Sequence, residues 1–114
     1  MKTVLLTGFD PFGGESTNPS WEAVAPLAGE LIAQHRVELA RLPTAFGRSR
    51  ASLLRAIARH DPQLVLCVGQ AGGRAAISLE RVAVNLIDAR IPDNRKRQPV
   101  DRPVLRGGPD AYLT

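Results

Sequence analysis

Glu80 is the residue of this sequence best placed to do chemistry. It is the only acidic residue in segment 62–87, and a strand there would put its side chain on the same inward face as Val82. Because a buried carboxylate is costly unless it is paired, this one could orient a catalytic histidine. The alternative, which the spacing by itself favours, is a structural ion pair with Arg74 or Arg81.

Two loops offer contacts to a ligand. The glycine-rich turn 69–73 follows an apolar run at 64–68, and open α/β sheets bind ligands at the carboxyl ends of their strands. This turn lacks the Lys-Ser/Thr pair of a phosphate loop and the spacing of a dinucleotide fingerprint, so a nucleotide site is disfavoured and a plain tight turn is the alternative. Phe9 and Phe12, which follow the first apolar run, either line a small apolar pocket or fill the top of the core.

The elements that would position these residues alternate between strand and helix. Short apolar runs predict strands, and apolar residues at helical spacing predict helices. The predicted strands are 3–7, 37–42, 64–68 and one or two within 76–87, and the predicted helices are 19–32 and 46–60. This order predicts a parallel α/β sheet with the first strand in its interior.

The first predicted helix has a clear start and an uncertain course. Asn18 is a suitable cap, and Pro19 suits the first helical position. Pro26 cannot donate a helical hydrogen bond, so it should kink the helix or break it in two. Leu31 and Ile32 continue the apolar spacing and are expected on the same helix.

The next two elements are expected to be well packed. The second helix should turn Leu54, Ile57 and Ala58 inward. The continuous apolar run at 64–68 is typical of a strand covered on both faces. Cys67 lies within this run and is therefore predicted to be a packed, inert thiol.

Composition and charge restrict the classes of protein to which this chain can belong. With 114 residues and 44% hydrophobic content, the chain is expected to form one domain with a single core. One cysteine indicates a reducing compartment, and the absence of a leader or membrane-length apolar stretch predicts a soluble cytoplasmic protein. The net charge of +4 includes a basic cluster in segment 90–106, but Asp93 and Asp101 interrupt it and no nucleic-acid-binding motif accompanies it. A solvated basic loop is therefore favoured over a nucleic-acid site.

Segment 92–114 shows no periodic apolar face. Four prolines and the pair Gly107-Gly108 interrupt it, and so long an irregular segment is unusual inside a compact domain. It is either a disordered tail or a loop whose packing partners lie in absent sequence, and the second interpretation is favoured.

Taken together, three blocks of sequence resemble the pyroglutamyl peptidase I family, also called the pyrrolidone-carboxylate peptidases. The first block is Thr7-Gly8-Phe9-Asp10-Pro11-Phe12-Gly13 with Asn18-Pro19-Ser20. The second and third are similar to the family's glutamate signature in order and spacing, and they are Gly69-Gln70-Ala71-Gly72-Gly73-Arg74 and Leu79-Glu80-Arg81-Val82-Ala83-Val84-Asn85 followed by Asp88-Ala89-Arg90-Ile91-Pro92-Asp93-Asn94. The resemblance implies the amino-terminal part, residues 1–114, of a three-layer α/β/α open twisted mixed sheet of the phosphorylase/hydrolase-like kind, here incomplete.

The resemblance also implies a cysteine peptidase with a Cys-His-Glu triad and no cofactor or metal. Glu80 would be the triad acid, and Arg90 would support the thiolate or a developing oxyanion. The implied substrates are peptides with amino-terminal pyroglutamate, and the implied substrate-binding residues are Phe9, Phe12, Asn18, Thr44, Gln70 and Ile91. Family members often form dimers or tetramers, so a homo-oligomer is implied as well.

The departure from the family is large, because its nucleophilic cysteine and catalytic histidine lie further along the chain than Thr114. Two triad members are therefore missing. Two alternatives stay open: a catalytically inactive truncated remnant, and a small basic α/β binding module whose basic loop binds an acidic partner.

Overall fold

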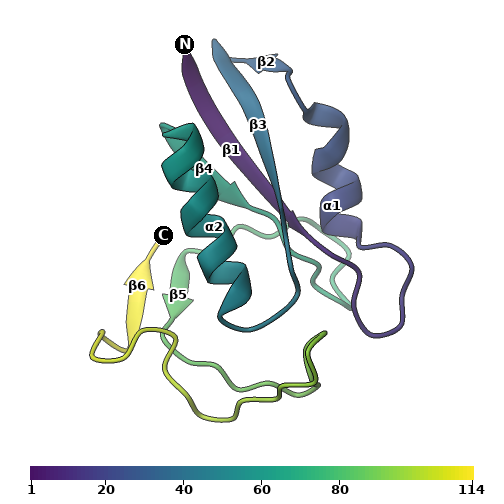
Figure 1. Cartoon of the computed structure of the whole chain (residues 1–114), viewed down its shortest axis with the longest axis vertical. Coiled ribbons are helices and arrows are strands. Elements are labelled where there is room, and N and C mark those ends of the chain that lie inside the picture. Colours follow the sequence, from purple (N-terminus) through teal and green to yellow (C-terminus); the bar gives the residue numbers. More distant parts are fainter. The chain divides into compact units, whose positions relative to one another are not determined.

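The apolar run at the amino terminus forms the central strand of a parallel three-stranded core. The computed structural model describes residues 1–114 and separates into two units, 1–70 and 71–114. In the first unit, β1 (Lys2–Phe9) lies between β3 (His35–Leu42) and β4 (Leu64–Cys67) and is parallel to both. The short strand β2 (Leu31–Ile32) adds an antiparallel edge beside β3, giving the order β2-β3-β1-β4 (Figure 1). The predicted interior position of the first strand is confirmed.

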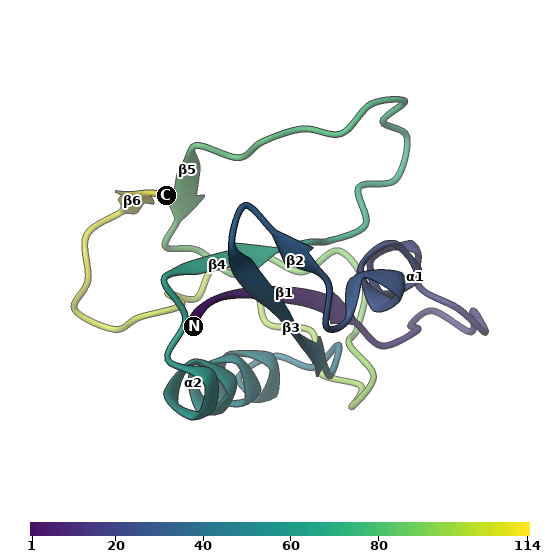
Figure 2. The same cartoon turned by 90° about the horizontal axis from the view of Figure 1, so that it is seen from above.

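The helices α1 (Pro19–Val24) and α2 (Arg48–His60) cover opposite faces of this sheet, as Figures 1 and 2 show. On one face, Leu6 and Val37 pack with Val24 of α1. On the other, Nδ1 of His60 at the end of α2 lies 3.9 Å from Oε2 of Glu38 on β3. The three-layer α/β/α arrangement with a mixed sheet is therefore confirmed.

Gly8 lets β1 and α1 meet backbone to backbone. A Cβ atom at Gly8 would lie 2.8 Å from both Cα and N of Trp21 and 3.0 Å from the carbonyl carbon of Ser20. Those atoms belong to the first turn of α1, so they cannot move aside as a flexible side chain would. The missing side chain therefore sets where α1 starts relative to the end of β1.

Replacing Gly8 with alanine is expected to lower the free energy of unfolding by about 1–3 kcal/mol or more, because overpacking must displace backbone. Thermal unfolding measures the effect. The matched control is Gly72→Ala, since a Cβ there meets nothing within 4 Å and the residue is exposed. Equal melting temperatures for the two variants would contradict the packing argument.

The first helix is shorter than predicted. It ends at Val24, and Ala25–Leu27 continues as a 3-10 turn, so the break predicted at Pro26 is confirmed. The prediction that Leu31 and Ile32 lie on a helix is wrong, because they form β2. Gly29 adopts a φ of 75° and turns the chain toward β3. Pairing with β3, and not helical spacing, therefore decides the conformation of Leu31 and Ile32.

The inward face of α2 is shifted by about one residue along the helix relative to the prediction. Leu53 and Ile57 are half-buried, whereas Leu54 is 47% exposed and Ala58 is exposed. The prediction is therefore correct for Ile57 and wrong for Leu54 and Ala58. Because Leu53 and Leu54 are adjacent, apolar spacing alone did not decide which of them faces the sheet.

One edge and much of one face of β4 are uncovered. Leu64 is 59% exposed and Leu66 is 46% exposed, on the sheet face that carries Val4 and Leu6. The predicted strand covered on both faces is wrong for this chain, because α1 packs over β1 and β3. Cys67 is exposed as well, so the predicted packed thiol is also wrong.

The second unit is a long antiparallel ribbon. Strand β5 (Val82–Val84) pairs with β6 (Ala111–Leu113), and a bridge between Ile87 and Arg102 continues the pairing. Only residues 82–84 of the predicted strand region 76–87 form a strand. Within segment 92–114, Ala111–Leu113 is the one strand formed. No helix of the protein has the length and apolar character needed to cross a lipid bilayer.

Candidate functional site

In the first unit, the carboxyl ends of three parallel strands meet at one edge of the sheet. Phe9 ends β1, Thr44 follows β3, and Gly69 and Gln70 follow β4. A Cβ atom at Gly69 would lie 4.0 Å from Cε2 of Phe9, so the glycine turn lies beside this aromatic ring. Within this unit, the first residue of the glycine turn and the loop after β1 therefore lie side by side.

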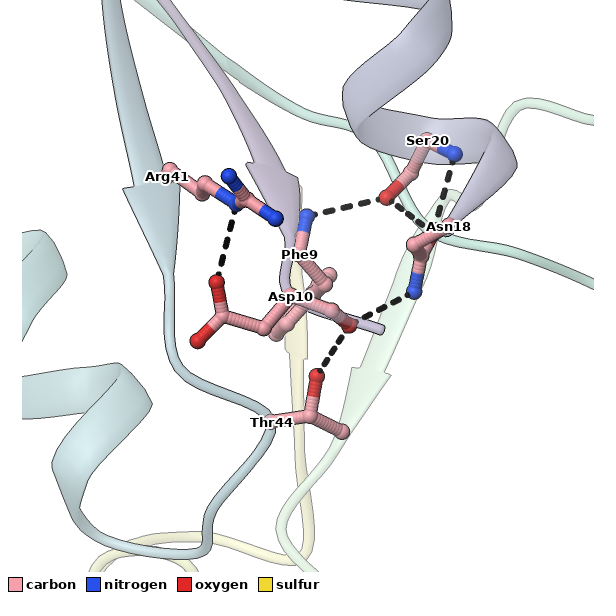
Figure 3. Close-up of polar contacts among 6 residues, drawn as sticks. All are labelled: Phe9, Asp10, Asn18, Ser20, Arg41 and Thr44. Carbon is pink, nitrogen blue, oxygen red and sulfur yellow. Dashed lines mark hydrogen bonds and ion pairs between the residues drawn. The ribbon is translucent and has the colours of Figure 1, made fainter. Parts of the chain in front are cut away.

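Three hydrogen bonds fix the backbone of Asp10, and Figure 3 shows the two that its carbonyl oxygen accepts. Its carbonyl oxygen accepts hydrogen bonds from Nδ2 of Asn18 at 3.0 Å and from Oγ1 of Thr44 at 2.8 Å. Its N–H donates to the carbonyl oxygen of Leu42 at 2.9 Å. Because both the N–H and the carbonyl oxygen of Asp10 are bonded, loop 9–12, called the aromatic loop below, starts from a defined backbone position.

Asn18 and Ser20 form a buried polar pair beneath this loop. Oδ1 of Asn18 accepts from the N–H of Ser20 at 2.9 Å and from its hydroxyl at 2.7 Å. The hydroxyl oxygen of Ser20 accepts from the N–H of Phe9 at 2.9 Å. Asn18 is 2% exposed and Ser20 is 3% exposed, so their mutual bonds compensate the loss of water that burial imposes. The predicted cap at Asn18 is confirmed.

An ion pair and a cation–π contact close the other side of the loop. Nε of Arg41 lies 2.9 Å from Oδ1 of Asp10, and the guanidinium carbon of Arg41 lies 5.5 Å from the centre of the Trp21 ring. Both side chains of the ion pair are partly exposed, so the pair contributes little stability by itself. Its geometric effect is to join β3, the loop after β1 and α1.

The predicted site residues of the first unit have different surroundings. Phe9, Phe12 and Thr44 are half-buried, and Gln70 is exposed. Asn18 and Thr44 use polar atoms to hold Asp10, which gives them a structural role in the loop. Their contact with a ligand stays a prediction, as do the contacts of the two phenylalanines and Gln70.

Sequence reasoning missed two members of this network. Ser20 and Arg41 received no role, although both hold the aromatic loop. The position of Ser20, two residues after a capping asparagine, was the only signal for it in the sequence. Arg41 gave no signal, because its contacts depend on how β1 and β3 pair.

The remaining predicted site residues lie in the second unit. Glu80 precedes β5, its side chain is 69% exposed, and its Oε1 lies 3.0 Å from Nη1 of Arg74. The prediction that Glu80 is buried is wrong for this chain, and the alternative ion pair with Arg74 is found. Arg90 and Ile91 are exposed, and their roles stay predictions.

The 114 residues contain no paired nucleophile and base. Cys67 is exposed on β4, His35 bonds through Nδ1 to the carbonyl oxygen of Ala33, and His60 lies near Glu38. No group of three or more His, Cys, Asp or Glu residues is arranged to hold a metal ion. The chain contains an aromatic loop whose backbone is held by hydrogen bonds. It also contains the carboxylate of Glu80, whose partner is Arg74.

These features define a class, an α/β protein of three layers with its candidate site at the carboxyl edge of the sheet. The sequence profile of the pyroglutamyl peptidase family matches residues 2–114. The chain belongs to the pyroglutamyl peptidase family.

Individual relatives agree with this assignment. The pyrrolidone-carboxylate peptidase of Gloeobacter violaceus is 60% identical over 110 residues, which are 96% of this chain and 54% of that protein. The one from Bacillus licheniformis is 56% identical over 111 residues, which are 97% of this chain and 52% of that protein. The chain thus spans about half the length of the curated relatives it matches.

Solved structures are similar over the same part. The crystal structure of Bacillus amyloliquefaciens pyroglutamyl peptidase I matches with a TM-score of 0.96 and 54% identity, covering 100% of this chain and 55% of that chain. Pyrrolidone carboxyl peptidase from the hyperthermophile Pyrococcus furiosus matches with a TM-score of 0.93 and 45% identity, covering 99% of this chain and 54% of that chain.

Proposed function

We propose that this chain is part of a cysteine peptidase that removes pyroglutamate from the amino termini of peptides. The observation that carries the proposal is the family membership of residues 2–114, together with an aromatic loop at the strand ends whose backbone is fixed by three hydrogen bonds. We use "the complete protein" below for a protein of the relatives' full length that contains these 114 residues.

In this proposal the aromatic loop binds the lactam ring of the substrate. A pyroglutamyl group is a small, flat, largely apolar ring with one amide edge, so it suits two aromatic faces and few hydrogen bonds. Phe9 and Phe12 would lie on either side of the ring, and Ile91 stays a proposed substrate contact. Gln70, which is exposed at the end of the first unit, would bond to the amide edge or the peptide beyond it.

Glu80 and Arg90 would act on the reacting groups. A thiolate from a cysteine beyond these 114 residues would attack the carbonyl carbon that joins pyroglutamate to the next residue. The C–N bond there would break, and the amine of the next residue would leave with a proton from the triad histidine. Water would then hydrolyse the acyl-enzyme and free the thiol. Glu80 would turn from Arg74 to hold the imidazole in the productive tautomer and stabilise its cation. Arg90 would stabilise negative charge on the sulfur or the carbonyl oxygen.

The test compares two fluorogenic amides that differ at the lactam. The complete protein is expected to cleave the pyroglutamyl amide and to leave the prolyl amide uncut, because proline has the ring but lacks the lactam carbonyl and carries a charged amine. Loss of activity on treatment with a thiol-alkylating reagent should accompany this selectivity. Equal cleavage of both amides, or cleavage of neither, would overturn the proposed function.

Two further properties belong to the same proposal. A cytoplasmic location is proposed because a peptidase with a thiolate nucleophile requires a compartment that keeps thiols reduced. A homo-oligomer, dimer or tetramer, is proposed on the ground of the family membership of residues 2–114 alone.

A further inference from the structure

The N–H of Phe9, at the end of β1, has no hydrogen-bond acceptor on the neighbouring strand β4. On the side of β1 that faces β4, the carbonyl oxygens of Thr3 and Thr7 accept from the N–H groups of Gln63 and Val68. Phe9 is the next residue of the same alternation, and its N–H points the same way. Strand β4 ends at Cys67, so the sheet supplies no further acceptor for Phe9.

Ser20 supplies that acceptor from α1. Its hydroxyl oxygen lies 2.9 Å from the N–H of Phe9, and the same hydroxyl donates to Oδ1 of Asn18 at 2.7 Å. The residue is 3% exposed, so water does not easily replace it. The close approach of Gly8 to the backbone of Ser20 and Trp21 holds the hydroxyl at this place.

We propose that Ser20 is a positioning residue for substrate binding, which fixes the backbone of Phe9 and thereby the aromatic face that meets the lactam ring. This inference rests on the proposed function. The hydroxyl links the N–H of Phe9 to Asn18, and Asn18 in turn holds the carbonyl of Asp10. The buried hydroxyl of Ser20 thus fixes the N–H of Phe9 directly and the carbonyl of Asp10 through Asn18.

The test compares Ser20→Thr with Ser20→Val in the complete protein. Threonine and valine have the same shape and differ by the hydroxyl, so any cost of the added carbon atoms is shared by both variants. Ser20→Val is expected to raise KM for a pyroglutamyl amide about tenfold over Ser20→Thr, with kcat within about twofold, as loss of binding without loss of chemistry requires. The inhibition constant of 2-pyrrolidone, a bare five-membered lactam, should rise in parallel.

Controls separate this role from stability. Ser52 is half-buried on α2, across the sheet from α1, and its Thr and Val variants should share one KM. Assays run well below the melting temperature of each variant, which thermal unfolding provides. Equal KM values for Ser20→Thr and Ser20→Val, in a protein whose wild type cleaves the substrate, would overturn the inference and leave the proposed function intact. A wild type that does not cleave it would overturn the proposed function itself.

Discussion

Replacing Glu80 with alanine in the complete protein is expected to lower kcat for a pyroglutamyl amide by about 10³–10⁴-fold, with little change in KM. Removing the orienting acid of a triad leaves the histidine in the wrong tautomer and its cation unstabilised, and losses of this size follow. Steady-state kinetics measures the effect. The exposed Glu15 provides a matched control, because its replacement with alanine should leave kcat unchanged.

Arg74 distinguishes the catalytic role of Glu80 from the ion pair that the structure contains. An exposed pair of this kind is worth about 0–1 kcal/mol, so Arg74→Ala should cost little stability and little activity. If Glu80 served only this pair, Glu80→Ala and Arg74→Ala would have the same small effect. A large loss of kcat for the first variant alone is the result expected here.

A polypeptide consisting of these 114 residues alone is expected to show no detectable turnover of pyroglutamyl amides. Its one cysteine is exposed on β4, and no hydrogen bond joins it to His35 or His60, whose partners are Ala33 and Glu38. Without a base beside it, this thiol has no group to accept its proton when it attacks a carbonyl carbon. A fluorogenic assay of the purified polypeptide, beside the complete protein at equal concentration, measures the difference.

Cys67→Ser in the complete protein is the matched control and should keep wild-type activity, since Cys67 is not the proposed nucleophile. Adding a polypeptide with the remaining residues of the complete protein to the 114-residue chain should restore turnover. Failure to restore it would favour an inactive remnant. Turnover by the 114-residue chain that Cys67→Ser abolishes would refute the assignment of the nucleophile.

Local sequence patterns were sufficient to locate β1, β3, β4 and α2, because short apolar runs and one long helical repeat mark them. They failed where tertiary pairing decided the outcome. Leu31 and Ile32 fit the helical spacing, yet pairing with β3 makes them a strand. Glu80 fits the alternation of a strand, yet the strand begins only at Val82. Neither result follows from spacing within one segment.

The same limit applies to the site. The positions of Phe9 and Asn18 could be predicted because a strand end and a helix cap are local features. The network that fixes them joins Asp10 to Thr44 and Arg41 across more than thirty residues, and it depends on the register between β1 and β3. A resemblance to a family supplied the proposed role of Glu80, which its surroundings in this chain would not have suggested.

The uncovered edge of β4 has a practical consequence for anyone who handles this chain. Strand β4 is the last strand of its sheet, and its side chains Leu64 and Leu66 are largely exposed. Such an edge is a template for intermolecular strand addition. Concentrated samples should therefore aggregate with time. A lysine placed on this edge, or a short peptide that pairs with it, should reduce this aggregation.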